Sequence, residues 1–137
     1  MKQELKNEQG DIYYTVEYLE QQNVVHSIWE GDYLLVEEVK QACSLGLSYI
    51  EKYEVTKIIN DNKKLKGSWD EANEWIAKTW MPQAIEAGLL KFAHVVADDI
   101  YAKLSAEFMK MENHVQEDEF ELRLFGNEKE ALEWLEK

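Results

Sequence analysis

One stretch, Asp61 to Glu107, constrains the fold more than any other, because it places helix-capping signals before a buried run of strand length. Ser68 and Glu71 have the S-x-x-E spacing of a capping box, which predicts a helix starting at Trp69. The run Lys91 to Ala97 is almost continuously apolar, as in a strand covered on both faces. A helix followed by such a strand is typical of an α/β sheet with parallel pairing.

The segments around this helix have their own boundary signals. Val55 to Asn60 is short and β-branched and predicts a strand, and residues 61–67 are polar and predict a loop. The only proline, Pro82, suits the first turn of a second short helix that Gly88 can end. We therefore expect a strand, a loop and two helical pieces that meet at a bend.

The N-terminal half predicts an antiparallel hairpin and a long helix. Polar and apolar residues alternate from Asp11 to Glu20, and a turn at residues 21–23 leads to a second β-rich run, Val24 to Trp29. Gly31-Asp32 breaks that strand. The helix that follows has one apolar face at 100° per residue, made of Leu35, Val36, Val39, Ala42, Cys43, Gly46, Ile50 and Tyr53. We interpret Gly46 as a point of close approach to a sheet, or as a tolerated position.

The C-terminal third predicts helix, strand, helix. Asp98 or Asp99 can cap a helix with an inner face of Ile100, Tyr101, Leu104 and Phe108. After an acidic loop at residues 117–119, apolar and charged residues alternate from Phe120 to Leu124, which suits an edge strand. Asn127 has a box-like spacing to Glu130 and is expected to cap the last helix.

These elements predict an α/β fold with a mixed sheet of about five strands, in which an N-terminal antiparallel hairpin is followed by β-α-β units. The chain has 137 residues, a length that matches one ordinary domain. We therefore expect a single domain over residues 1–137, with residues 1–10 as a polar N-terminal tail.

Charge and composition limit the partners. With 28 acidic and 15 basic side chains the formal net charge is −13, which repels a phosphate backbone and an anionic membrane surface. We expect no nucleic acid and no membrane insertion, because the apolar runs are far shorter than the roughly 20 residues that span a bilayer. The single cysteine, Cys43, excludes an internal disulfide, and the polar N-terminus lacks a signal-peptide core. A cytoplasmic location is therefore predicted.

Several motifs together resemble a known family. They are WEG at Trp29 to Gly31, DNKK at Asp61 to Lys64, W-x-x-x-x-W-x-P-x-A-x-x-A-G at Trp75 to Gly88, and AKLSAE at Ala102 to Glu107. The chain resembles the small single-domain STAS-like, or SpoIIAA-like, proteins of bacteria. This resemblance covers nearly the whole chain, and its motifs are mostly structural.

The resemblance implies a binding or regulatory role. Proteins of this fold include anti-sigma factor antagonists, which bind a partner and are switched by phosphorylation of a Ser or Thr beside a helix N-terminus. The related CRAL-TRIO domains bind lipids. The antagonists have a D-S-S-G-like loop where this chain has DNKKLKGSWD. Ser68 is the only hydroxyl there, and it is either a phosphorylation site or simply a helix cap.

Lys63, Lys64 and Lys66 form the one dense basic cluster, between a strand end and a helix start. Ligands bind at that edge of open α/β sheets, and helix starts favour anions. With Ser68 they form a candidate anion-binding or phospho-switch loop; the alternative is a solvated loop, because the several glycines of a phosphate-binding loop are missing.

No catalytic residue, metal site or cofactor is predicted. The three histidines, His26, His94 and His114, show no metal-ligand spacing, and His94 is interpreted as a core residue. Trp69, Trp75 and Trp80 are expected to fill core. The leading hypothesis is a non-enzymatic module that binds a protein partner or associates with itself, as in a homodimer. The second is a carrier or sensor of a small apolar or anionic ligand. The third is an enzyme, which would need a cleft gathering Asp61, His94 and Asp98.

Overall fold

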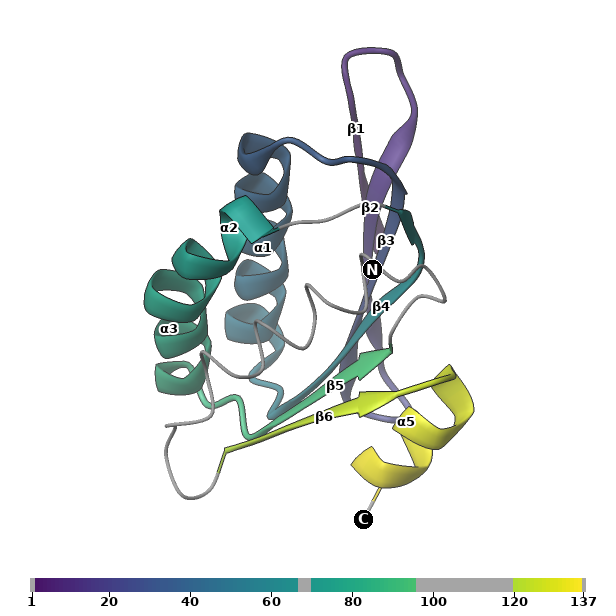
Figure 1. Ribbon diagram of the computed structural model, residues 1–137. Coiled ribbons are helices and arrows are strands. Elements are labelled where there is room, and N and C mark those ends of the chain that lie inside the picture. The colour runs from purple at the N-terminus through teal and green to yellow at the C-terminus, as the bar shows by residue number, and fades with distance from the viewer. Residues whose placement is uncertain (1, 67–69, 96–119, 137) are drawn as a thin grey trace.

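The computed structural model describes residues 2–66, 70–95 and 120–136, and within them it is an α/β fold built on one six-stranded sheet (Figure 1). The strands lie side by side in chain order. β1, β2 and β3 pair antiparallel, and β3 to β6 pair parallel. Their bounds are β1 Lys2–Lys6, β2 Ile12–Leu19, β3 Val24–Asp32, β4 Lys57–Lys66, β5 Lys91–Val95 and β6 Glu121–Phe125. The α/β class and the hairpin β2–β3 are confirmed.

The expected number of strands was wrong, because the sheet has six strands and not about five. The additional strand, β1, lies within residues 1–10, which were expected to be a tail. It pairs with β2 at the edge of the sheet, and its side chains are mostly exposed. An edge strand held by backbone hydrogen bonds needs no apolar alternation, so its polar sequence did not reveal it.

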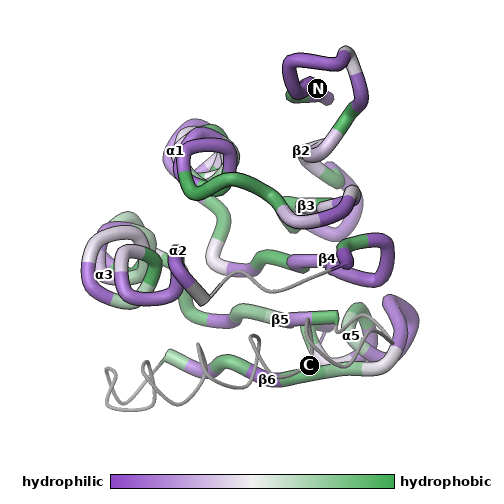
Figure 2. The backbone as a smooth tube through the Cα atoms, turned by 45° about the horizontal axis from the view of Figure 1, so that its top comes forward, coloured by the Kyte–Doolittle hydropathy of each residue, from purple (hydrophilic) through white to green (hydrophobic). Residues whose placement is uncertain are grey.

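Helices cover the two faces of the sheet unequally (Figure 2). The connections between the parallel strands place α1 (Val36–Tyr53) and the run α2 (Asp70–Trp75), η1 (Ile76–Trp80) and α3 (Met81–Glu86) on one face. Right-handed crossovers between strands that follow one another in order put their helices on the same side. The last helix, α5 (Glu128–Leu135), follows β6 and packs on the opposite face.

The apolar face of α1 is confirmed in most positions. Its buried residues are Val39, Ala42, Cys43, Gly46, Tyr49 and Ile50. Three predicted positions are not buried: Val36 and Tyr53 are half-buried, and Leu35 lies at the N-cap and is 64% exposed. The Glu38 carboxylate accepts a hydrogen bond from the Leu35 backbone N–H at 2.9 Å, so this position supports the helix start and adds nothing to the core.

The predicted loop at residues 61–67 was also wrong in most of its length, because β4 continues to Lys66. The predicted break at Gly31-Asp32 is likewise part of β3. The two extensions pair with each other, with Gly31 beside Leu65 and Asp32 beside Lys66. Leu65 is buried in the core and fixes the extension. Pairing between distant segments therefore outweighed a local sequence typical of a loop.

Between β4 and β5, the sequence signals for the second short helix are confirmed. Pro82 lies in the first turn of α3, and Gly88, with a φ of +114°, follows the helix end. Between α2 and α3, residues Ile76–Trp80 form a π-helical segment, and the helical run passes through it without a gap. The predicted start of this helix at Trp69 lies outside the described residues.

Two hydrophobic clusters hold the layers together. The larger one lies between the sheet and α1 to α3. The smaller one lies under α5 and contains Val24, Ile59, Ala93, Val95, Ala131, Trp134 and Leu135. β5 is buried on both faces, as predicted, but it is next to the edge strand β6 rather than at the sheet centre. The edge position of β6 and the Asn127 cap of α5 are confirmed.

The remaining predictions for the C-terminal third, a helix after Asp98 or Asp99 and an acidic loop at residues 117–119, lie outside the described residues. Among the helices that are described, none is both long and apolar enough to cross a bilayer.

Candidate functional site

The predicted basic cluster lies on a strand, not in a loop. Lys63, Lys64 and Lys66 are exposed along the second half of β4. In the parallel register Lys64 pairs with Glu30 and Lys66 with Asp32. An anion bound to these lysines would therefore have two carboxylates of β3 as neighbours, which weakens its attraction to the cluster.

The other residues proposed for a site do not come together. Ser68 and Asp98 lie outside the described residues. His94 and Asp61 are on opposite faces of the sheet, because His94 pairs with Asn60 and successive residues of β4 point to opposite sides. His94 is fully buried in the core, as predicted. The enzyme hypothesis required these side chains in one cleft, and the structure separates Asp61 from His94.

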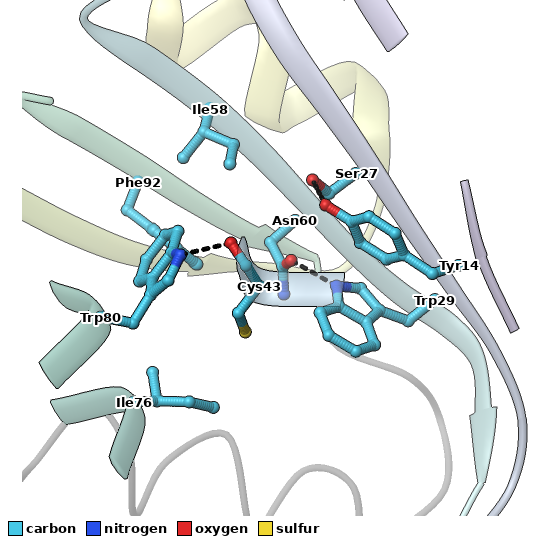
Figure 3. A pocket seen from close by; sticks show the side chains of 9 residues that line it. All are labelled: Tyr14, Ser27, Trp29, Cys43, Ile58, Asn60, Ile76, Trp80 and Phe92. Carbon is cyan, nitrogen blue, oxygen red and sulfur yellow. Dashed lines mark hydrogen bonds between the residues drawn. The ribbon is translucent and has the colours of Figure 1, made fainter. Parts of the chain in front are cut away.

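A small cavity lies between the sheet and the helices (Figure 3). Its walls are Tyr14, Ser27, Trp29, Cys43, Ile58, Asn60, Ile76, Trp80 and Phe92. Trp80 is buried, as predicted, and its indole N–H donates to the backbone carbonyl of Cys43 at 2.6 Å. The volume is about 20 Å³, which is room for a single water molecule. The cavity is a gap in a packed core.

Next to this cavity, hydrogen-bonded polar side chains form a chain that runs from β3 through β4 to β5 on one face of the sheet. The indole N–H of Trp29 donates to Asn60 Oδ1 at 2.6 Å, and the Asn60 amide lies 3.0 Å from His94 Nδ1 and 3.2 Å from Asn62 Oδ1. With the amide donating, His94 Nδ1 accepts and the ring is neutral. Burial lowers the pKa of His94 to about 3. This chain is structural, since it satisfies polar groups within the core.

On the opposite face, three ligand-bearing side chains meet beside the amino-terminal part of β3 and the middle of β4. His26 comes from β3, Asp61 from β4 and Glu128 from the first turn of α5. Their ligand atoms all lie within 4.8 Å of one another, and His26 Nε2 is 2.8 Å from Glu128 Oε1. Asn127 accepts a hydrogen bond from the Glu130 N–H at 2.9 Å and so fixes where α5, and with it Glu128, begins.

The two carboxyl groups of this cluster affect each other strongly. Burial, and then a hydrogen bond with Glu128, raise the pKa of Asp61 to about 6, although the Lys63 backbone N–H and His26 oppose the shift. The pKa of Glu128 is lowered, mainly by the hydrogen bond with Asp61. The two carboxyl groups therefore share one proton. They keep it at pH values well above the pH at which an exposed Asp side chain loses its proton.

Sequence spacing gave no signal for this cluster. The β3–β4 register places Ile28 beside Asp61, and His26 lies two positions before Ile28 on the same face. Glu128 reaches the cluster only because α5 folds back over that face (Figure 1). Metal-ligand motifs are recognised by short spacing along the chain, and these three residues are far apart in it.

A second surface feature is an acidic groove at the carboxyl end of β3. It has a volume of about 540 Å³ and lies between the β1–β2 turn, the end of β3 and the start of α1. Four carboxylates line it, from Asp11, Glu30, Asp32 and Glu38, together with Tyr33 and Leu35. Tyr33 is 72% and Leu35 64% exposed. Tyr33 has a φ of +53°, a backbone conformation that non-glycine residues adopt at a cost.

In comparisons with known proteins, no family model matches the chain, and none of the curated proteins and none of the solved structures matches it significantly.

Proposed function

We propose that this chain is a STAS-like, non-enzymatic regulatory module of the cytoplasm, which binds a protein partner through the acidic groove. The observation that carries the proposal is the pair of exposed apolar side chains, Tyr33 and Leu35, set among four carboxylates. Large exposed apolar side chains rimmed by charge are typical of protein interaction sites.

The charge of the groove indicates the chemistry of the partner. No lysine or arginine is among the described residues that line it, and the whole chain has a net charge of −13. A partner segment with basic side chains would gain from this field, and an apolar side chain between them would cover Tyr33 and Leu35. We therefore infer a basic partner segment with at least one apolar anchor.

The fold supports the STAS-like assignment. A hairpin is followed by parallel strands, and the crossover helices that the structure describes, α1 and the run α2 to α3, lie on one face. The groove lies at the carboxyl end of β3, beside the point where the sheet changes from antiparallel to parallel pairing. Ligands of open α/β sheets bind outside the carboxyl ends of strands.

Site-specific photo-crosslinking tests this proposal. A photoreactive amino acid is placed at position 33 and, as the matched control, at position 90, because Leu90 is 39% exposed and lies outside the groove. In lysate of the source cells we expect a discrete adduct from position 33 only, with a crosslinked partner peptide that contains Lys or Arg. An adduct between two copies of the chain would replace the heterologous partner by self-association, and equal labelling from both positions would contradict the proposal.

A variant then separates apolar contact from general charge attraction. The double variant Tyr33→Ala/Leu35→Ala keeps the net charge and should weaken binding of the captured partner at least 10-fold, since anchor residues dominate such interfaces. Leu90→Ala should leave the affinity unchanged. Equal affinity of the double variant and the wild type would show that charge alone drives the binding.

The alternative function, a carrier or sensor of a small apolar or anionic ligand, stays a prediction. The core cavity of about 20 Å³ gives no support for an enclosed apolar ligand there. The exposed Lys63, Lys64 and Lys66 are the candidate contacts for an anion. Native mass spectrometry of the purified chain would detect a retained small molecule, and its absence at all collision energies would remove this alternative.

A further inference from the structure

We infer that His26, Asp61 and Glu128 form a binding site for one divalent first-row transition-metal ion, such as Zn²⁺ or Mn²⁺. One imidazole nitrogen and two carboxylates from three separate elements face a common point. This site is on the opposite face of the sheet from the core cavity and does not share residues with the acidic groove.

The distances suit metal coordination. Bonds from Zn²⁺ to histidine nitrogen and carboxylate oxygen are about 2.0–2.2 Å, so an ion between these atoms requires ligand atoms roughly 3–4 Å apart. The cluster has all its ligand atoms within 4.8 Å, with the closest pair, His26 Nε2 and Glu128 Oε1, at 2.8 Å. Small side-chain rotations therefore bring all three groups to bonding distance.

The charges of the cluster call for a cation. Asp61 is only 7% exposed, and its carboxyl group faces that of Glu128. Within the described residues, no lysine or arginine side chain lies within 4.0 Å of either carboxylate. The positive end of α5 and the more distant Lys63 offset part of the negative charge, but the two carboxylates remain next to each other, and a divalent ion neutralises both.

The ligand set selects the class of ion. An imidazole favours zinc and the other transition metals, whereas Mg²⁺ and Ca²⁺ prefer oxygen ligands alone. The surroundings also hold the ligands in place: the Lys63 backbone N–H donates to Asp61 Oδ1 at 2.9 Å, and the Asn127 cap fixes the start of α5. The Glu128 side chain is 39% exposed, so water has access to the remaining coordination positions.

Isothermal titration calorimetry on the metal-free chain tests the site. The chain is stripped with EDTA, dialysed and titrated separately with ZnCl₂, MnCl₂ and MgCl₂. We expect one Zn²⁺ or Mn²⁺ per chain, weaker binding of Mg²⁺, and at least a 10-fold loss of affinity in His26→Gln and Glu128→Gln. The matched control is Glu133→Gln, an exposed glutamate of the same helix, which should bind like the wild type.

Far-UV circular dichroism of the metal-free variants checks that each is folded. If His26→Gln is unfolded, Glu128→Gln still tests the site, because Glu128 is partly exposed and its substitution should not disrupt the core. Two results would overturn the inference. One is a stoichiometry far below one ion per chain for both transition metals. The other is unchanged affinity in the folded cluster variants, which would place the ion elsewhere on the acidic surface. Equal affinity for Mg²⁺ would reject the assignment to transition metals.

Discussion

At Gly46 the first helix comes into direct contact with the sheet. A Cβ atom added there would lie 2.7 Å from the hydroxyl of Tyr14, which is itself 2.6 Å from Ser27 Oγ in a buried hydrogen bond. Gly46 lies inside the apolar stripe of the helix, where the sequence left two interpretations, close approach to a sheet or a tolerated position, and the first is confirmed. The helix accepts a residue of low helix propensity because a larger one would push it away from β2.

The variant Gly46→Ala should lower the free energy of unfolding by about 1–3 kcal/mol, because overpacking outweighs the gain of about 1 kcal/mol in helix propensity. Urea denaturation followed by circular dichroism measures this change. In a Tyr14→Phe background the loss should be smaller, since the hydroxyl in contact is gone. Gly126→Ala is the matched control, with no atom within 4 Å of the added Cβ. A Gly46→Ala protein as stable as the wild type would contradict the close approach.

Among the elements, α5 depends most clearly on its surroundings. It has eight residues, a length at which an isolated helix is not stable in water. Its start is fixed by Asn127, and its inner side, Ala131, Trp134 and Leu135, packs on β4 and β5. The arrangement matters for the metal site, because Glu128 is the first residue of the helix. The sequence identified the cap, but only the packing decided which face of the sheet α5 covers.

Removing the cap should destabilise the chain. Asn127→Ala leaves the Glu130 N–H without its side-chain acceptor and is expected to cost about 1 kcal/mol in the free energy of unfolding. The matched control is Asn127→Ser, which retains a capping oxygen and should stay close to the wild type. Thermal denaturation of the three proteins at one pH gives the comparison, and equal losses in both variants would mean that the side chain of Asn127 does not act as a cap.

At the scale of the whole molecule, the two faces of the sheet hold polar groups of different charge: neutral groups on one face and charged groups on the other. The larger core encloses a neutral His94 in a chain of hydrogen bonds, while the smaller core borders the charged cluster of His26, Asp61 and Glu128. The large helical layer on one face excludes water from His94, which is fully buried. The short α5 leaves its first turn partly open to solvent. The extent to which the helices bury a polar group thus decides whether that group stays neutral.

Burial of His94 predicts how stability depends on pH. Its pKa is about 3 in the folded chain and about 6.5 when unfolded, so between these values the unfolded state binds the extra proton. Stability is therefore lost as the pH falls from about 6.5 to 3, by at most about 1.4 kcal/mol for each pH unit. The raised pKa of Asp61 acts with the opposite sign between about pH 4 and 6, so the effect of His94 must be isolated by substitution.

Urea denaturation at a series of pH values from 4 to 7 makes that comparison. His94→Asn keeps an acceptor for Asn60 and removes the titrating ring, so its stability should fall less steeply toward acid than that of the wild type. Identical slopes for the wild type and His94→Asn would show that His94 takes up its proton without unfolding.

Much of the fold could be predicted because it depends on local rules. The stripe of α1, the start of α3 at Pro82, its end at Gly88 and the Asn127 cap each follow from a few neighbouring residues. Two features could not be predicted in this way, namely strand β1 and the second half of β4. Both have polar sequences typical of tails and loops, and both are held by backbone pairing with another strand.

The same distinction applies to function. The sequence by itself determined the α/β class, the strongly acidic surface and the burial of His94. Only the tertiary structure decided that the side chains of Asn60 and its neighbour Asp61 point to opposite faces of the sheet, and that Asp61 lies beside His26 and Glu128. The physical reason is that helix periodicity and capping are properties of adjacent residues, whereas a site is made by strand register and helix docking, which join residues far apart in the chain.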